Sequence, residues 1–180
     1  MLFRSRLARA AAWLEAAGGL QTLVAGYGAD RTFAAPIVAL AAAAGLARWE
    51  ECPELPFWLA ALPRWSLRFL GLPVVSYALP ALIAVGLARF ANAPPAGRLA
   101  RWTGNLARGP ALAALARIVP ASGGFLEAVP LTSFVLLSLL SAGLRAHPAL
   151  EPGLAFLERT QRPDGAWPVD SDLSVWVTTL

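Results

Sequence analysis

Residue types that commonly carry chemistry are scarce in this chain. Its 180 residues include one cysteine (Cys52), one histidine (His147) and four aspartates, and every one of the 15 basic Lys+Arg residues is an arginine. One cysteine and one histidine exclude an internal disulfide and a structural zinc site of the usual type. The absence of lysine excludes P-loop and Schiff-base lysine chemistry. We therefore expect no metal site and no cofactor.

Asp170 and Asp172 are the closest pair of aspartates and the only, weak, candidates for a catalytic acid. A carboxylic acid that donates a proton to an unreactive group must stay protonated in a dry site. Residues 173–180 are predicted to form an apolar helix, and a helix N-terminus stabilises carboxylates in their charged form. The position of Asp170 and Asp172 therefore favours helix capping over proton donation.

Charge is distributed unevenly along an apolar chain. Hydrophobic residues make up 57% of the sequence and charged residues 14%, a composition too apolar for a disordered protein. Residues 61–120 contain seven arginines and no acid. Long apolar runs separate these arginines, a pattern that suits an anionic membrane surface better than a nucleic-acid duplex. We therefore expect a membrane surface as a partner, and no nucleic acid.

The longest uncharged run, residues 69–88, has the length of a membrane span but contains two prolines. Proline is favoured in the first turn of a helix, so Pro36, Pro80 and Pro130 predict the starts of shorter, buried helices. A small multispan membrane protein is the alternative interpretation of these runs. Residues 1–17 do not resemble a signal peptide, so a cytoplasmic location is expected.

Helices joined by Pro- and Gly-rich loops are predicted throughout, without period-2 strands. Residues 131–144 are apolar on every side and are expected to be buried. Residues 91–97, which contain adjacent prolines, predict a weak internal break. Alternating buried and amphipathic helices indicate a two-layer ring or solenoid. The main predicted helices cover residues 2–17, 35–48, 77–90, 99–118 (weakened by Gly104, Gly109 and Pro110), 131–144 and 150–161.

The last of these helices, residues 150–161, has the clearest periodicity. Leu150, Leu154 and Leu157 recur at positions i, i+4 and i+7 and predict a stripe that packs against residues 131–144. The helix is therefore expected to lie on the outside of the buried one.

A motif with fixed spacing ends this helix. Phe156 is expected to pack inward, Gln161 to end the helix, and Gly165 to take the positive φ that the following turn requires. The ring of Trp167 is then expected to lie against the Gln161 amide or the end of the helix. With this spacing, residues 153–167 resemble the Q-W repeat of the squalene and terpene cyclases.

The resemblance extends along most of the chain and is weakest at residues 89–122. Residues 9–19 look like a degenerate copy of the repeat, without the glutamine. The segments that resemble bacterial squalene–hopene cyclases and related hopanoid-type proteins are residues 26–33, 53–57, 72–80 and 124–132.

This resemblance implies a single partial domain over residues 1–180, an incomplete all-α (α/α) toroid. It implies part of a cyclase, an isomerase in class, that converts a linear polyprene such as squalene by a proton-initiated carbocation cascade. It also implies peripheral attachment to the cytoplasmic side of a membrane. Aromatic and apolar side chains line the substrate cavity in the family. The matching positions here are Phe33, Val74, Tyr77 and Leu82, and the spacing of the sequence adds Trp176.

The acid of the family belongs to a D-x-D-D motif that this sequence lacks. In the family that motif lies downstream of the segment that matches Leu180, so the chain looks like a fragment and is expected to be inactive on squalene by itself. The alternative from a different functional class is a non-catalytic toroid that binds at the membrane surface.

Overall fold

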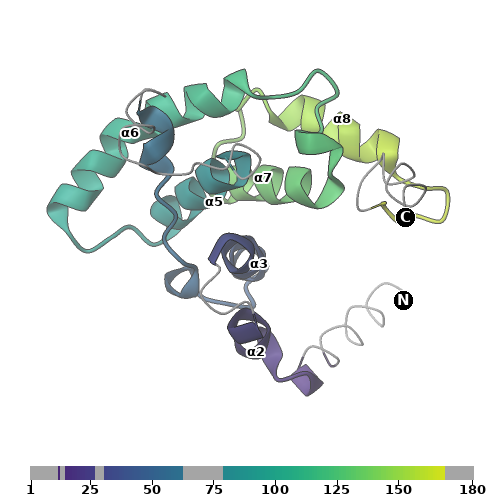
Figure 1. The fold of residues 1–180 in the computed structure, drawn as a ribbon, viewed down its shortest axis with the longest axis horizontal. Coiled ribbons are helices and arrows are strands. Elements are labelled where there is room, and N and C mark those ends of the chain that lie inside the picture. Colours follow the sequence, from purple (N-terminus) through teal and green to yellow (C-terminus); the bar gives the residue numbers. More distant parts are fainter. Residues whose placement is uncertain (1–11, 13–14, 27–30, 63–78, 169–180) are drawn as a thin grey trace, which may run out of the picture.

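The structure is a computed structural model that describes residues 12, 15–26, 31–62 and 79–168 (Figure 1). Every regular element in these ranges is a helix and none is a strand, so the expected all-α class is confirmed for them. In chain order the elements are α2 (Gly19–Gly26), α3 (Arg31–Ala43), η1 (Trp49–Glu51), η2 (Phe57–Ala61), α5 (Leu79–Asn92), α6 (Arg98–Arg117), η3 (Phe125–Glu127), α7 (Val129–Ser141) and α8 (Leu150–Thr160), the three η elements being 3-10 helices.

Helix α7 lies at the centre of the described fold. It packs along α5 and also contacts α3 and α8, while α6 lies against η2 and α5 (Figure 1). The main core contains Ile83, Leu115, Phe125 and Leu139, which come from four different elements. None of the described helices is both long enough and apolar enough to cross a membrane.

Two helices end earlier than the sequence analysis predicted. The predicted helices 35–48 and 131–144 end at Ala43 and Ser141, because Gly45 and Gly143 take positive φ values of 75° and 74°. In both cases the glycine and the residue after it donate backbone hydrogen bonds to the last helical turn. These are Schellman motifs, which glycine forms without strain.

Helix α3 also begins earlier than predicted. It starts at Arg31, and Pro36 lies inside the helix and not at its start. A proline inside a helix removes one backbone hydrogen bond. The buried side chains of Ala35, Val38 and Ala39, which pack with Cys52 in a second cluster, offset this loss.

Helix α6 is continuous across Gly104, Gly109 and Pro110, although these residues were expected to weaken it. Gly104 is needed for packing: a Cβ atom there would lie 2.4 Å from Cε2 of Phe90. The close approach of α5 and α6 at Gly104 compensates for the low helix propensity of glycine. Residues 93–97, within the predicted internal break, connect these two helices, and both helices contribute to the main core.

Burial of α7 is incomplete, in contrast to the expectation for residues 131–144. Val135, Leu136 and Leu139 are fully buried, whereas Leu137 and Leu140 are 43% and 41% exposed. The exposed pair lies on the side of α7 that no described element covers. An all-round apolar sequence therefore predicted more burial than the described residues provide.

Helix α8 packs through part of the predicted stripe: Leu150 and Leu157 pack in or against the main core, as predicted, but Leu154 does not. Leu150, Gly153 and Phe156 are buried, whereas Leu154 is 48% exposed. The reason is the close contact at Gly153, where a Cβ atom would lie 2.7 Å from Cδ2 of Leu136. This contact turns the glycine face of α8 toward α7 and directs Leu154 outward.

Candidate functional site

The predicted cavity and acid residues fall mostly outside the part of the chain that the structure describes. Five of the seven residues lie outside the described part: Val74, Tyr77, Asp170, Asp172 and Trp176. Phe33 and Leu82, the other two predicted cavity residues, belong to α3 and α5. The side chain of Leu82 is partly buried and packs against the main core.

The turn after α8 has the geometry that its sequence predicted. Gln161 is the C-cap residue of α8, and Gly165 has a φ of 82°. The Gln161 amide donates from Nε2 to the carbonyl oxygen of Gly165 at 3.1 Å. The carboxylate of Asp164 accepts from the backbone N–H of Ala166 at 3.0 Å. These contacts close the turn over residues 161–166.

Trp167 anchors this turn to the helix that precedes it. Its indole Nε1 donates to the carbonyl oxygen of Leu157 in the last turn of α8, at 2.7 Å. The ring therefore lies at the end of the helix, as predicted, but it is 46% exposed. Phe156, the residue before Leu157, is fully buried. The Cζ atom of Arg159 lies over its ring, 5.9 Å from the ring centroid.

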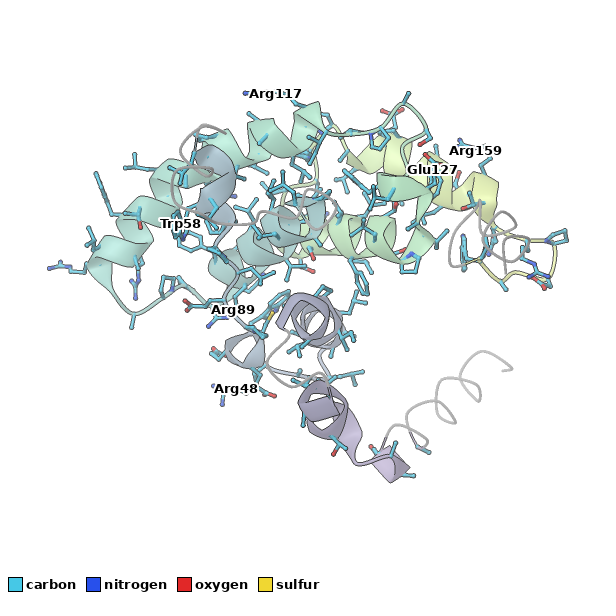
Figure 2. The ribbon with its side chains drawn as sticks, in the orientation of Figure 1. Arg48, Trp58, Arg89, Arg117, Glu127 and Arg159 are labelled. Atoms are coloured by element: carbon cyan, nitrogen blue, oxygen red, sulfur yellow. The ribbon has the colours of Figure 1, made fainter. Side chains whose placement is uncertain are left out.

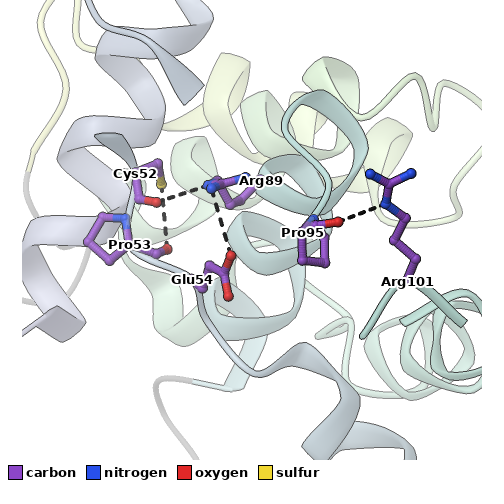
Figure 3. Close-up of polar contacts among 6 residues, drawn as sticks. All are labelled: Cys52, Pro53, Glu54, Arg89, Pro95 and Arg101. Atoms are coloured by element: carbon purple, nitrogen blue, oxygen red, sulfur yellow. Dashed lines mark hydrogen bonds and ion pairs between the residues drawn. The ribbon is translucent and has the colours of Figure 1, made fainter. Parts of the chain in front are cut away.

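A second arrangement, which the sequence analysis did not predict, centres on Arg89 near the end of α5. Its side chain is 12% exposed and reaches toward the loop after η1 (Figure 2). Nε donates to the carbonyl oxygen of Cys52 at 3.0 Å, and Nη2 lies 3.8 Å from Oε1 of Glu54 (Figure 3). Nη1 is buried and has no hydrogen-bond partner among the described residues.

Arg89 and Glu54 line a pocket of about 380 Å³ between η2, α5 and α6. The pocket walls are largely apolar and include Phe57 and Phe90, whose rings meet edge to face at 5.4 Å. Its volume lies near the lower end of the range for small-molecule sites, and a few polar groups in an apolar lining are typical of them.

Arg89 has no close, buried counter-ion among the described residues. Burial raises the pKa of the Cys52 thiol to about 11, although the positive charge of Arg89 opposes this shift. The thiol is therefore neutral at pH 7 and does not pair with the guanidinium. Glu54 is 68% exposed, so solvent screens its attraction to Arg89.

Sequence reasoning missed this pocket because its walls come from segments far apart in the chain. One signal was present: Arg89 is the single charged residue of α5, a helix whose one other polar side chain is that of Asn92. A charge there must either reach solvent or find a partner inside.

In comparisons with known proteins, no family model matches this chain, and no curated protein or solved structure matches it either.

Proposed function

We propose that this chain is part of a squalene–hopene-cyclase-like (α/α) toroid that binds a linear polyprene such as squalene. The observation that carries the proposal is the turn after α8, where Gln161, Gly165 and Trp167 combine the spacing of the Q-W repeat with a closed, hydrogen-bonded geometry. The all-helical elements of the described residues are compatible with a toroid built from helix pairs.

In this proposal the residues of this chain bind the polyprene and exclude water. Phe33, Tyr77 and Trp176 would place aromatic faces beside the substrate, where they stabilise positive charge through their quadrupoles. Val74 and Leu82 would complete an apolar wall. The sequence contains no D-x-D-D motif, so an acid from outside these 180 residues would start the cascade, and the chain alone is expected to bind squalene without cyclising it.

Helix α6 supports delivery of the substrate from a membrane surface. Leu99, Trp102 and Leu106 are 73%, 60% and 58% exposed, at helical spacing. The same helix carries four arginines and no acid. Apolar and basic side chains combined on one exposed helix are typical of binding at an anionic lipid interface. This location would be peripheral, on the cytoplasmic side.

The second candidate function is a non-catalytic toroid that binds at the membrane surface. The exposed apolar and basic side chains of α6 favour it as much as they favour a cyclase. The two candidates differ in turnover: only a cyclase would convert the bound polyprene when an acid is supplied.

Saturable binding of radiolabelled squalene to the purified chain in detergent tests the proposal. We expect competition by unlabelled squalene but not by hexadecane, and weaker binding in Tyr77→Ala. Leu154→Ala, which removes an exposed leucine of α8, is the matched control and should bind normally. Binding that does not saturate, or that is equal in both variants, would contradict the proposed cavity.

Mass spectrometry of the same reaction tests for cyclic triterpenes, of which we expect none above background. Turnover that disappears in Asp170→Asn or Asp172→Asn would instead identify these residues as the acid. The same assay on a longer chain that carries a D-x-D-D acid, if one is encoded, then separates a cyclase from a binding module.

A further inference from the structure

The pocket between η2, α5 and α6 contains a buried cation whose hydrogen-bonding capacity is largely unused. A guanidinium carries five N–H donors. In Arg89, Nε has one acceptor, Nη1 has none among the described residues, and the Nη2–Glu54 distance of 3.8 Å is too long for a hydrogen bond. Because an unpaired buried charge is costly, an acceptor entering the pocket would be favoured.

The surroundings select the charge of that acceptor. Helix α6, which forms one wall, carries only basic charged residues. Glu54 is the one acid that lines the pocket, and its carboxylate is mostly in solvent. Arg89 is the one basic residue that lines the pocket, and its planar guanidinium matches the geometry of carboxylate and phosphate oxygens.

The walls select the rest of the ligand. Phe57, Phe90 and Pro95 present apolar surface to the pocket, and Trp58 stands at its edge with 46% of its surface exposed. Gly86 and Gly104 keep these walls close together, since a Cβ atom at either position would come within 3 Å of a neighbouring atom. A hydrophilic anion would leave this apolar surface unused.

We propose that this pocket binds an amphipathic oxyanion, a molecule with a carboxylate or phosphate head and an apolar body. The head accepts hydrogen bonds from Nη1 and Nη2 of Arg89, and the body lies against Phe57 and Phe90. Glu54 competes with the head for the guanidinium and swings into solvent when the ligand enters. This ligand differs in chemical class from the proposed polyprene, because squalene carries no charge.

Displacement of the fluorescent fatty acid cis-parinarate from the full chain tests the proposal. The competitors are dodecanoate, dodecyl phosphate and dodecanol, which share one apolar body and differ in the head. We expect the better of the two anions to compete about tenfold more strongly than dodecanol, and the comparison of the two anions identifies the preferred head. Equal competition by all three would overturn the proposal.

Three variants locate the binding. Arg89→Gln should weaken the better anion about tenfold and leave dodecanol unchanged. Arg101→Gln is the matched control, because Arg101 also donates from Nε to a backbone carbonyl, that of Pro95 at 2.7 Å, but is exposed (Figure 3). Glu54→Gln should strengthen anion binding about two- to fivefold, by removing the competing carboxylate.

Two results would contradict the assignment to Arg89. One is an equal loss in Arg89→Gln and Arg101→Gln, which indicates nonspecific attraction to basic charge. The other is anion binding that is unchanged or weaker in Glu54→Gln. Circular dichroism checks the fold of each variant, and Glu54→Gln, which changes an exposed residue, decides the question if Arg89→Gln does not fold.

Discussion

The turn after α8 and the pocket beside α5 differ in how their polar groups are paired. In the turn, the side chains of Gln161, Asp164 and Trp167 each have a hydrogen-bond partner no more than ten residues away in the chain. In the pocket, Arg89 finds its one hydrogen-bond acceptor 37 residues away, at Cys52, and Nη1 has no partner among the described residues.

This difference separates two uses of polar side chains. The turn completes its own hydrogen bonds when it forms, so its contacts stabilise the local structure. The pocket forms only when three segments of the chain come together, and it retains a donor that a ligand can use. Substitutions in the two regions should therefore have different effects. In the turn they should lower the stability of the protein, and in the pocket they should alter ligand binding with little loss of stability.

The largest expected loss of stability comes from a substitution at Gly123, because this residue packs against α8, the helix that the first region follows. Gly123 has a φ of 83°, and a Cβ atom there would lie 2.0 Å from the carbonyl oxygen of Pro152 in α8. Gly123→Ala should lower the free energy of unfolding by about 3 kcal/mol or more, from backbone strain and overpacking together. Urea denaturation followed by circular dichroism measures this change.

Gly143→Ala is the matched control for Gly123→Ala. Gly143 has a similar φ of 74° but no atom within 4 Å of the added Cβ. It should cost about 1 kcal/mol, from backbone strain alone. Equal costs for the two variants would show that α8 does not depend on close contact at Gly123.

An intermediate effect is expected at Trp167. Because the ring is half-exposed and donates one hydrogen bond, Trp167→Ala should lower the free energy of unfolding by about 1–2 kcal/mol. This is less than the cost for a fully buried aromatic residue. Trp102→Ala, at a ring that is 60% exposed on α6, should cost less than about 0.5 kcal/mol in the same titration. A Trp167 variant as stable as the Trp102 variant would mean that the turn does not depend on its indole.

The smallest effect on stability is expected at Arg89. Replacing an incompletely paired buried cation by an apolar side chain of similar length is often neutral or stabilising. Removing Arg89 leaves no buried charge behind, because Glu54 is mostly in solvent. Arg89→Met should therefore change the free energy of unfolding by less than about 1 kcal/mol, measured by thermal and urea denaturation. A loss of about 3 kcal/mol would place Arg89 among structural residues and remove the contrast between the two regions.

The same contrast explains how much the sequence could predict. The turn after α8 was predictable because Gln161 and Gly165 act on their immediate neighbours. The ends of α3 and α7 depend on equally local glycines, Gly45 and Gly143, but the apolar runs around them favoured longer helices. Local patterns also established the all-α class of the described residues.

Long-range contacts set the features that were missed. The outward direction of Leu154 depends on Gly153 meeting Leu136 in another helix. The Arg89 pocket depends on η2, α5 and α6 coming together. Neither arrangement leaves a periodic signal in the sequence, because each rests on the relative position of separate elements.

Pro110 in the middle of α6 has a consequence for local opening of the pocket. Proline has no N–H, and its ring displaces the carbonyl group of the residue four positions earlier. For Pro110 this residue is Leu106, which is exposed. The backbone ladder of α6 is therefore interrupted at this point. Ala111 and Leu115 anchor the following half in the core, both at 0% exposure.

The preceding half of α6 contributes only Ala107 to the main core and should exchange its amide hydrogens sooner. This half carries Ala100, Thr103 and Gly104, which form a wall of the Arg89 pocket. Transient fraying of residues 98–106 would thus open the pocket while the main core stays closed.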